Sequence, residues 1–350
     1  MLFLKRAILA ELTIIAALFL STASTAEIVS TTADASLPAL FGSASLILTG
    51  QVASVDSGAE VIADWKGQPE RLRQFTSTII PDRIYKGEPG TPVRVAYVRP
   101  TRRVCAVSKC VSMNPGEYGL FFLRRQGDNY QILDGLYQGF GVSRLKSPGV
   151  LKGIQGVEAD LIAGFRDEDE RRVLTNVELF GGLEHATSIL PLLDLVQLYP
   201  AGTIEGAAYV ALLRLHRYTK LREAAIFSER SANDPTELAI QDRICGLIEV
   251  IDDPAASQVL ISLAHARSDR LRGAVIHALR NITSAAAVPV FVGALDDTVN
   301  LIRYDAVMGL AAVERNPQLA PSVSAFLSNE SEYIGAWKSW WLTSGKKSYE

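Results

Sequence analysis

The chain has 350 residues, of which 48% are hydrophobic and 21% are charged, and its formal net charge is −3. This composition supplies enough apolar side chains for a substantial core, and the length predicts roughly two domains. The slight excess of acidic residues and the absence of a basic tract give no electrostatic support to nucleic-acid binding.

Residues 1–26 have the pattern of a secretory signal peptide. Lys5 and Arg6 provide the positive start, an apolar stretch covers 7–20, and small residues precede a cleavage site before Glu27. The alternative is an uncleaved membrane anchor, but the apolar stretch is shorter than the roughly 20 residues that span a bilayer. We therefore predict an exported protein, periplasmic or secreted, with no membrane span in the mature chain.

Alternating apolar residues and turn signals predict a β domain over residues 27–146. The expected strands are Ser45–Val55, Phe75–Tyr85, Pro92–Val98, Tyr118–Leu123 and Tyr130–Leu133, with a further short strand in Leu136–Val142. The polar stretch Asp56–Arg73 is expected to be a long hairpin connection, and Pro81 is expected to mark an edge or a bulge. Five or six strands at this spacing predict a small antiparallel barrel.

The order of several short motifs in this domain resembles the netrin-type, metalloproteinase-inhibitor-like OB-fold module. The motifs are Gly50-x-Val52-x-x-Val55, Tyr85-Lys86-Gly87, Val93-x-Val95, and Gly116-x-Tyr118-x-Leu120-Phe121-Phe122 with a cysteine before it. Inhibitors of that family use an amino-terminal cysteine to ligate a protease zinc ion. No cysteine lies near Glu27, so the resemblance implies the fold without that activity.

The three cysteines are expected to have different roles. Cys105 and Cys110 lie in a predicted loop and are candidates for a small disulfide in an exported protein. Cys245 lies in a helical pattern and is expected to be a buried, unreactive thiol.

Residues 147–185 are expected to form a linker and a first helix, Glu158–Glu170, that ends in a solvated charge run, Arg166–Arg172. Further helices are predicted in Ala186–Leu198, Ile204–Arg217, Leu221–Ser228, Pro235–Ile251, Ala255–Ala266, Asp269–Asn281, Ala285–Leu295, Asn300–Val313 and Ala320–Leu327. The fold class expected for the whole chain is therefore α+β, with a small barrel followed by helices.

A repeat organises the helical part over residues 186–334. Arg272 and Arg303 lie 31 residues apart, as do Leu279 and Leu310, and each arginine opens an Ala-rich helix that a second apolar helix follows. Two helices per unit at this period predict an α-solenoid. The pattern resembles HEAT-like repeats, and Arg243, 29 residues before Arg272, suggests one earlier unit.

Six residues of this part are candidates for contacts with a partner. They are Arg272, Arg303, Tyr304, Trp337, Trp340 and Trp341. The alternative for the arginines is a structural bond to an acidic turn such as Asp296-Asp297. The alternative for the tryptophans, which share one helical face, is that residues 335–350 form a hydrophobic cap on the solenoid.

No known catalytic motif appears in the sequence. The four histidines form neither HExxH nor an i, i+4 pair, and there is no nucleophile elbow, phosphate loop or dinucleotide fingerprint. We therefore predict a non-catalytic interaction or scaffold protein with no cofactor and with an unknown protein partner. The alternative functions are an envelope enzyme with a distributed site and a protease inhibitor acting through the barrel.

Overall fold

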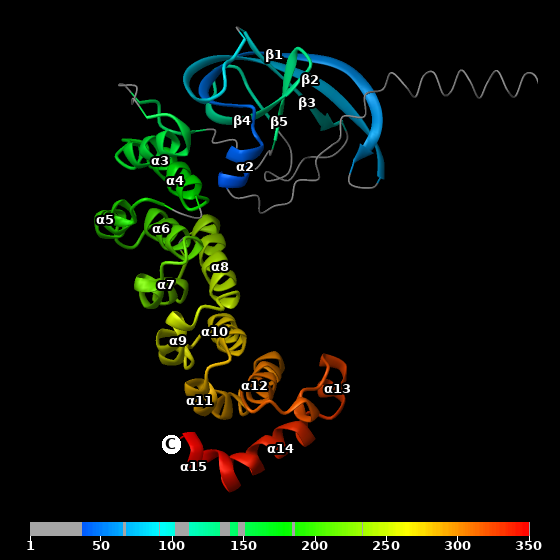
Figure 1. Ribbon diagram of the computed structural model, residues 1–350, viewed down its shortest axis with the longest axis vertical. Coiled ribbons are helices and arrows are strands. Elements are labelled where there is room, and N and C mark those ends of the chain that lie inside the picture. Colours follow the sequence, from blue (N-terminus) through cyan, green and yellow to red (C-terminus); the bar gives the residue numbers. More distant parts are fainter. Residues whose placement is uncertain are drawn as a thin grey trace, which may run out of the picture. The chain divides into compact units, whose positions relative to one another are not determined.

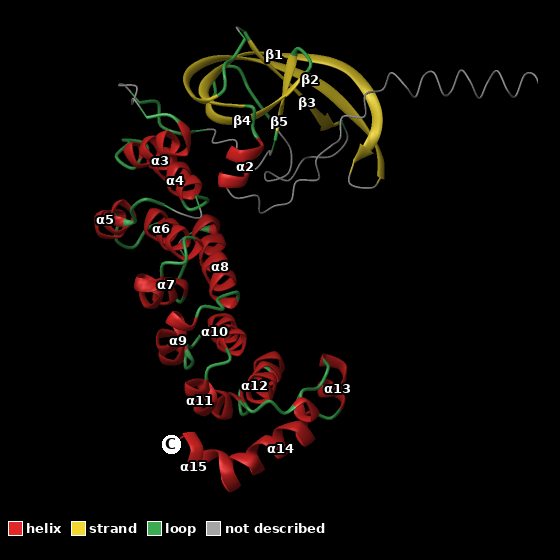
Figure 2. Ribbon diagram, in the orientation of Figure 1, coloured by secondary structure: helices red, strands yellow, loops and turns green. Residues whose placement is uncertain are grey.

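The computed structural model describes residues 37–65, 68–90, 92–101, 112–133, 141–145, 151–183, 186–232 and 234–349. The predicted signal peptide and the predicted disulfide of Cys105 and Cys110 lie outside these residues. The chain divides into two compact units (Figure 1), one formed mainly by residues 42–117 and 121–138 and the other mainly by residues 139–350. The sheet belongs to the first unit and the stacked helices belong to the second (Figure 2).

The first unit is a five-stranded sheet. Its strands are β1 (Leu46–Trp65), β2 (Gln68–Lys86), β3 (Val93–Pro100), β4 (Tyr118–Gln126) and β5 (Asn129–Ile132). The strand order β1-β2-β3-β5-β4 closes into a barrel, and backbone hydrogen bonds of Val52 with Gly116 and Glu117 join β1 to the start of β4. The sheet is not purely antiparallel as predicted, because β3 and β5 pair in parallel.

Two glycines allow close backbone approaches in this sheet. A Cβ atom at Gly50 would lie 2.5 Å from the carbonyl oxygen of Ile80, and one at Gly87 would lie 2.2 Å from that of Ser45. Gly87 also has φ +77°, a conformation that only glycine adopts without strain. A register shift lies beside the pairing of Gly50 with Pro81, which confirms the bulge predicted from the proline.

The predicted long connection Asp56–Arg73 is wrong. β1 and β2 remain paired from Ser57 opposite Phe75 to Trp65 opposite Gln68, so that strand pairing continues through most of this stretch. Most side chains of this ribbon are exposed on both faces, which removes the alternation of apolar and polar residues that marks a half-buried strand. Cross-strand pairs stabilise the ribbon instead, such as Glu60 with Arg73, whose side chains meet at 2.5 Å.

The remaining elements are helices. They are α2 (Leu37–Ser43), α3 (Gly153–Gly164), α4 (Glu170–Phe180), α5 (Leu190–Leu198), α6 (Thr203–Arg214), α7 (Leu221–Ser228), α8 (Pro235–Glu249), α9 (Ser257–Leu263), α10 (Asp269–Ile282), α11 (Val288–Ala294), α12 (Asn300–Val313), α13 (Val323–Ser328), α14 (Glu330–Trp340) and α15 (Lys346–Tyr349). Short 3₁₀ turns precede α7, α9 and α11 and follow α12, and a π-helical segment, Trp341–Gly345, joins α14 to α15. Both α7 and α12 begin and end at the predicted residues.

The helices of the second unit stack in two rows. Helices α4, α6, α8, α10 and α12 each pack on the next member of this first row, and α3, α5, α7, α9 and α11 each pack beside one or two of them. This arrangement confirms the predicted helical solenoid, in which each pair buries its apolar side against its neighbours. No helix in the described part of the chain has the length and hydrophobicity needed to cross a bilayer.

Helix α6 is buried on every side from Ile204 to Leu213. Its small residues allow this, since a Cβ at Gly206 would lie 2.6 Å from the ring of Phe227. The side chains of Arg243 on α8 and Glu178 on α4 meet at 3.2 Å, although α6 lies between these helices in the row. The ion pair therefore links α8 to α4 directly, in addition to the packing of both helices on α6.

The single helix predicted over Glu158–Glu170 is wrong. α3 ends at Gly164, and the predicted charge run contains the start of α4, with Asp169 as its N-cap accepting a hydrogen bond from the backbone nitrogen of Arg171. Gly164 is required at the end of α3 because a Cβ there would lie 2.6 Å from the side chain of Asn176. Sequence analysis missed α4 because it interpreted the capping carboxylates as part of a solvated surface.

Candidate functional site

Arg272 and Arg303 hold equivalent places in the repeat. Arg272 donates from Nη1 to the carbonyl oxygen of Ala266, six residues earlier, at 3.1 Å. Arg303 donates in the same way to the carbonyl oxygen of Asp297, also six residues earlier, at 2.6 Å. Each arginine therefore secures the turn that precedes its own helix.

Each arginine also reaches a carboxylate of the following unit. Arg272 makes two bonds to Asp297, from Nε at 2.6 Å and from Nη2 at 3.0 Å. Arg303 bonds to Glu330 at the start of α14. The side chains of Arg272 and Arg303 are only 16% and 20% exposed, so both guanidinium groups are mainly engaged within the stack. The structural alternative for the arginines, a bond to the Asp296-Asp297 turn, is confirmed for Arg272.

Asp297 joins three parts of the solenoid. Its carboxylate binds Arg272 and accepts from the backbone nitrogen of Val299, while its carbonyl oxygen binds Arg303. The hydrogen bonds from Arg272 hold the pKa of the Asp297 carboxyl below its ordinary value.

The earlier unit predicted from Arg243 is present as α7 and α8, but Arg243 itself does not hold the place of Arg272, because its side chain bonds to Glu178 on α4. Gln241 takes that place, because its side-chain nitrogen donates to the carbonyl oxygen of Arg230 at 3.0 Å in the turn after α7. Gln241 lies 31 residues before Arg272, the same spacing that separates Arg272 from Arg303. The side chain of Arg230 in turn bonds to the buried carboxylate of Glu205 on α6 at 2.7 Å. Here the arginine lies in the turn and the carboxylate on the helix, the reverse of Arg272 and Asp297.

A second group of side chains connects α10 to α12, and we call His277, Arg280, Tyr304 and Asp305 the α10–α12 cluster. Asp305 lies 3.0 Å from Nδ1 of His277 and 2.6 Å from Nη1 of Arg280. The guanidinium of Arg280 also lies 5.7 Å from the centre of the Tyr304 ring. These side chains are partly exposed, and the sequence analysis anticipated only Tyr304 among them.

The three tryptophans differ in exposure. Trp337 is 1% exposed and its Nε1 has no hydrogen-bond partner among the described residues, whereas Trp340 and Trp341 are half-buried. The rings of Trp337 and Trp340 pack edge to face at 5.3 Å. Gly345 lies against the rings of Trp340 and Trp341, where a Cβ would be within 2.9 Å of both. Trp337 is therefore a packing residue, whereas Trp340 and Trp341 keep part of their surface exposed.

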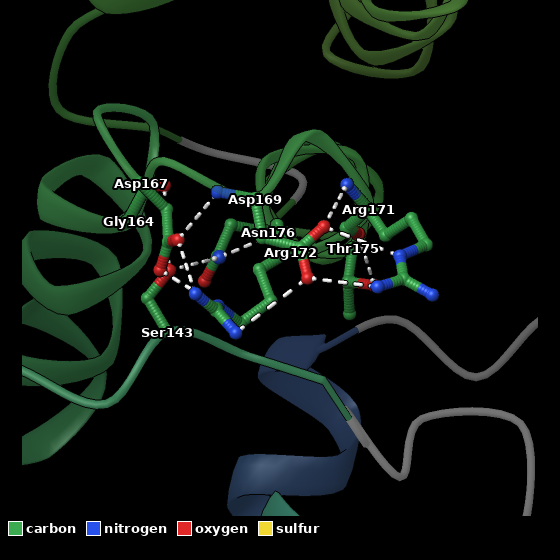
Figure 3. A network of polar contacts seen from close by, with 8 residues as sticks. All are labelled: Ser143, Gly164, Asp167, Asp169, Arg171, Arg172, Thr175 and Asn176. Atoms are coloured by element: carbon green, nitrogen blue, oxygen red, sulfur yellow. Dashed lines mark hydrogen bonds and ion pairs between the residues drawn. The ribbon is translucent and has the colours of Figure 1, made fainter.

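A third polar network fixes the junction of α3 and α4 (Figure 3). Arg172 makes two bonds to Asp167 at 2.7 and 2.9 Å, and Asn176 donates to Ser143 Oγ at 3.0 Å. The bonds from Arg172 hold the pKa of Asp167 far below its ordinary value. Each of these groups faces a partner within the network, so the arrangement stabilises the helix pair.

The described residues contain no group of three or more His, Cys, Asp or Glu side chains able to hold a metal ion. Cys245 is buried, as predicted, and burial raises the pKa of its thiol, which opposes formation of a reactive thiolate.

Comparison with known proteins supports the repeat interpretation. Residues 225–311 match the HEAT repeat family. The match runs from within α7 to near the end of α12, and it suggests a protein-interaction scaffold. No curated protein matches the chain. A crystal structure of an engineered protein is 15% identical, over 46% of this chain and 80% of that one, with a TM-score of 0.30. A score this low supports no conclusion.

Proposed function

We propose that this protein is an exported, non-catalytic scaffold that binds a protein partner. The partner lies along the first row of helices, α4, α6, α8, α10 and α12, which we call the long-helix row. The observation that carries the proposal is the HEAT repeat match together with the continuous packing of α8, α10 and α12. Stacked repeats of this kind present an extended surface on which several successive helices contact one partner. The α10–α12 cluster supplies charged and aromatic groups on that surface.

Site-specific photocrosslinking in the native host tests this proposal. A photoreactive residue replaces Met308, which is half-buried on α12, or Gln258, which is exposed on α9 in the other row. We expect a discrete crosslinked species from position 308 and none from position 258. Equal crosslinking from both positions would contradict the proposal. The absence of crosslinking from position 308 and from further positions on α8 and α10 would also contradict it.

Export is the second part of the proposal, and it depends on the sequence of residues 1–26. Mass spectrometry of the protein purified from cell fractions tests it. We expect a mature chain that begins near Glu27 in the periplasmic or secreted fraction. A chain that keeps Met1 and stays in the cytoplasm would contradict export without affecting the scaffold proposal.

We further infer that the first unit is an OB-type barrel. The inference is supported by its five strands, by the closed order in which β3 neighbours β5, and by the glycines at positions 50 and 87. A netrin-like relationship remains part of this inference. For the function of this unit, protease inhibition is the less favoured alternative to a scaffold role. A direct inhibition assay on the mature protein decides between these two functions.

We also propose that the chain has no enzymatic activity. His277 and Asp305 resemble a base and its orienting group, but no hydroxyl or thiol of the described residues is hydrogen-bonded to His277. An envelope enzyme with a distributed site is the alternative. An enzymatic activity that His277→Ala abolishes would favour this alternative. A substitution elsewhere that does not disturb folding should leave that activity intact.

A further inference from the structure

The ribbon formed by the distal halves of β1 and β2 has one open edge. β1 bonds to the start of β4 through Val52, and after that residue no backbone hydrogen bond within the described chain joins β1 to a strand other than β2. β2 is itself covered on its other side, where β3 pairs with it from Leu72 to Ile79. The stretch of β1 that leads to Trp65 therefore presents backbone groups to its open side.

The register identifies which residues face this open side. In an antiparallel pair, opposite residues either exchange both backbone bonds or point away from each other, and the two kinds alternate along the strand. Arg71 lies opposite Ile62, and its carbonyl oxygen accepts from the backbone nitrogen of Thr101 after β3. Arg71 therefore points away from β1. The N–H and C=O of Ile62 consequently point to the open edge, as do those of Glu60 two residues earlier.

The side chains along this edge complement an additional strand. Ile62 is 73% exposed, and Glu60 is exposed with its carboxylate bonded to Arg73 across the ribbon. Arg99 lies opposite Arg73 on β3, so a row across the sheet runs from two cations to an anion at the open edge. A strand added there would continue this row with a basic residue opposite Glu60 and an apolar residue opposite Ile62.

The charge of β1 also distinguishes between possible occupants. All charged residues of the strand are acidic, namely Asp56, Glu60 and Asp64. Two copies of the chain paired through this edge would therefore repel each other, whereas a strand with basic residues would be attracted. The edge is better suited to a different protein than to a second copy.

An open strand edge specifies extended backbone as its occupant. Its donors and acceptors are spaced for a β-strand, and such an edge is a template on which another strand pairs. The register shift between Ser57 and Glu60 interrupts the ladder, which confines regular pairing to residues 60–65. We propose that residues 60–65 of β1 bind an extended segment of a partner protein as an additional strand. That segment carries a basic residue two positions from an apolar one.

Binding of a synthetic peptide to the full chain tests this proposal. The probe is a fluorescent peptide in which threonine alternates with lysine and valine, and the reference peptide has glutamate in place of lysine. We expect fluorescence anisotropy to show binding of the lysine peptide below about 1 mM and weaker binding of the glutamate peptide. Amide exchange followed by NMR should slow at Glu60 and Ile62 when the peptide binds. It should not change at Val61, whose N–H already faces β2.

Two substitutions at one position separate backbone from side-chain recognition. Ile62→Pro removes the N–H that points to the open edge and leaves the bonds to β2 in place, so it should lower the affinity by about tenfold. Ile62→Thr keeps the N–H and should lower it by about threefold. Glu60→Lys should reverse the preference and favour the glutamate peptide. The control is Ile80→Thr on β2, where the isoleucine is 59% exposed and outside residues 60–65. It should bind like the original chain, and urea unfolding should show that all four variants stay folded.

The free chain supplies the strictest check. Slow amide exchange at Glu60 and Ile62 without peptide would show that the chain covers this edge itself. Dimers that Ile62→Pro abolishes would show that a second copy occupies it, and either result would overturn the proposal. Absence of binding by the lysine peptide, or binding that Ile62→Pro leaves unchanged, would also overturn it. None of these results would affect the scaffold proposal, which concerns the long-helix row.

Discussion

At the residue scale, Asp297 connects Arg272, Val299 and Arg303. Its carboxylate is 9% exposed and binds Arg272, whereas the neighbouring Asp296 is 72% exposed and binds Lys338. Removing one partner of a desolvated pair leaves the other charge buried, while an exposed pair contributes little. We expect Asp297→Ala to lower the free energy of unfolding by about 2–4 kcal/mol. Asp296→Ala should lower it by less than about 1 kcal/mol. Urea unfolding measures both, and equal losses would show that the buried pair of Arg272 and Asp297 contributes no more to stability than the exposed pair.

The same carboxylate predicts a dependence on pH. Its folded pKa lies below the ordinary value of 3.8, so its contribution to stability is fully present above that value and is lost as pH falls through the folded pKa. The difference in unfolding free energy between the original chain and Asp297→Asn should therefore be constant from pH 7 to about pH 5 and should shrink below about pH 4. Urea titrations at pH 7, 5 and 3 measure it. A difference that grows with acid would mean that the pair is not formed.

Residues that end the long helices carry backbone strain. His216, Thr283 and Arg315 follow α6, α10 and α12 with φ between 53° and 55°, a left-handed conformation that glycine adopts most easily. We expect Arg315→Gly to raise the free energy of unfolding by about 1 kcal/mol. Ala312→Gly, at an exposed position inside α12, should lower it by about the same amount. Thermal unfolding of the two variants provides the comparison, and a loss in both would show that the side chain of Arg315 matters more than its backbone.

At the element scale, two glycines in long helices should respond in opposite ways to alanine. A Cβ at Gly206 on α6 would lie 2.6 Å from the Phe227 ring and 2.7 Å from Ile240, whereas one at Gly246 on α8 would meet no atom within 4 Å. We expect Gly206→Ala to lower the free energy of unfolding by about 1–3 kcal/mol through overpacking. Gly246→Ala should raise it by about 0.5–1 kcal/mol, because alanine favours the helix. Chemical denaturation measures both, and a stabilised Gly206→Ala would show that α6 packs less tightly than the structure indicates.

The elements also show how far sequence reasoning reached. Helices α7 and α12 were located to the residue because their apolar periodicity ends at clear breaks. The arginine at position 272 was correctly linked to the acidic turn, since a repeat places equivalent residues in equivalent surroundings. Helix α4 was missed because its charged first turn resembles a solvated loop. The ribbon of β1 and β2 was missed because a strand exposed on both faces lacks a period of two.

The α10–α12 cluster could not be predicted for a different reason. His277 and Asp305 come from separate repeats, 28 residues apart, and their contact depends on the rotation of α12 against α10. Sequence spacing fixes which residues share a face of one helix, but the contact between two helices follows from packing that only coordinates describe. Gln241 was overlooked because a search for a repeated arginine does not accept glutamine, although both side chains donate to a turn carbonyl.

At the scale of the whole molecule, a solenoid transmits the loss of a contact mainly to adjacent repeats. Trp337 is fully buried, and the flanking residues Glu330 and Lys338 bind Arg303 and Asp296. We expect Trp337→Ala to speed amide hydrogen exchange most in α12 to α14, less in α10, and not at all in strands β1 to β4. Hydrogen exchange followed by mass spectrometry resolves these peptides. Leu342→Ser, which removes an exposed apolar group from the same segment, should leave the whole pattern unchanged. Faster exchange spread evenly over the sheet and all helices would show that the chain unfolds as a single cooperative body, and the repeat-by-repeat account of its stability would fail.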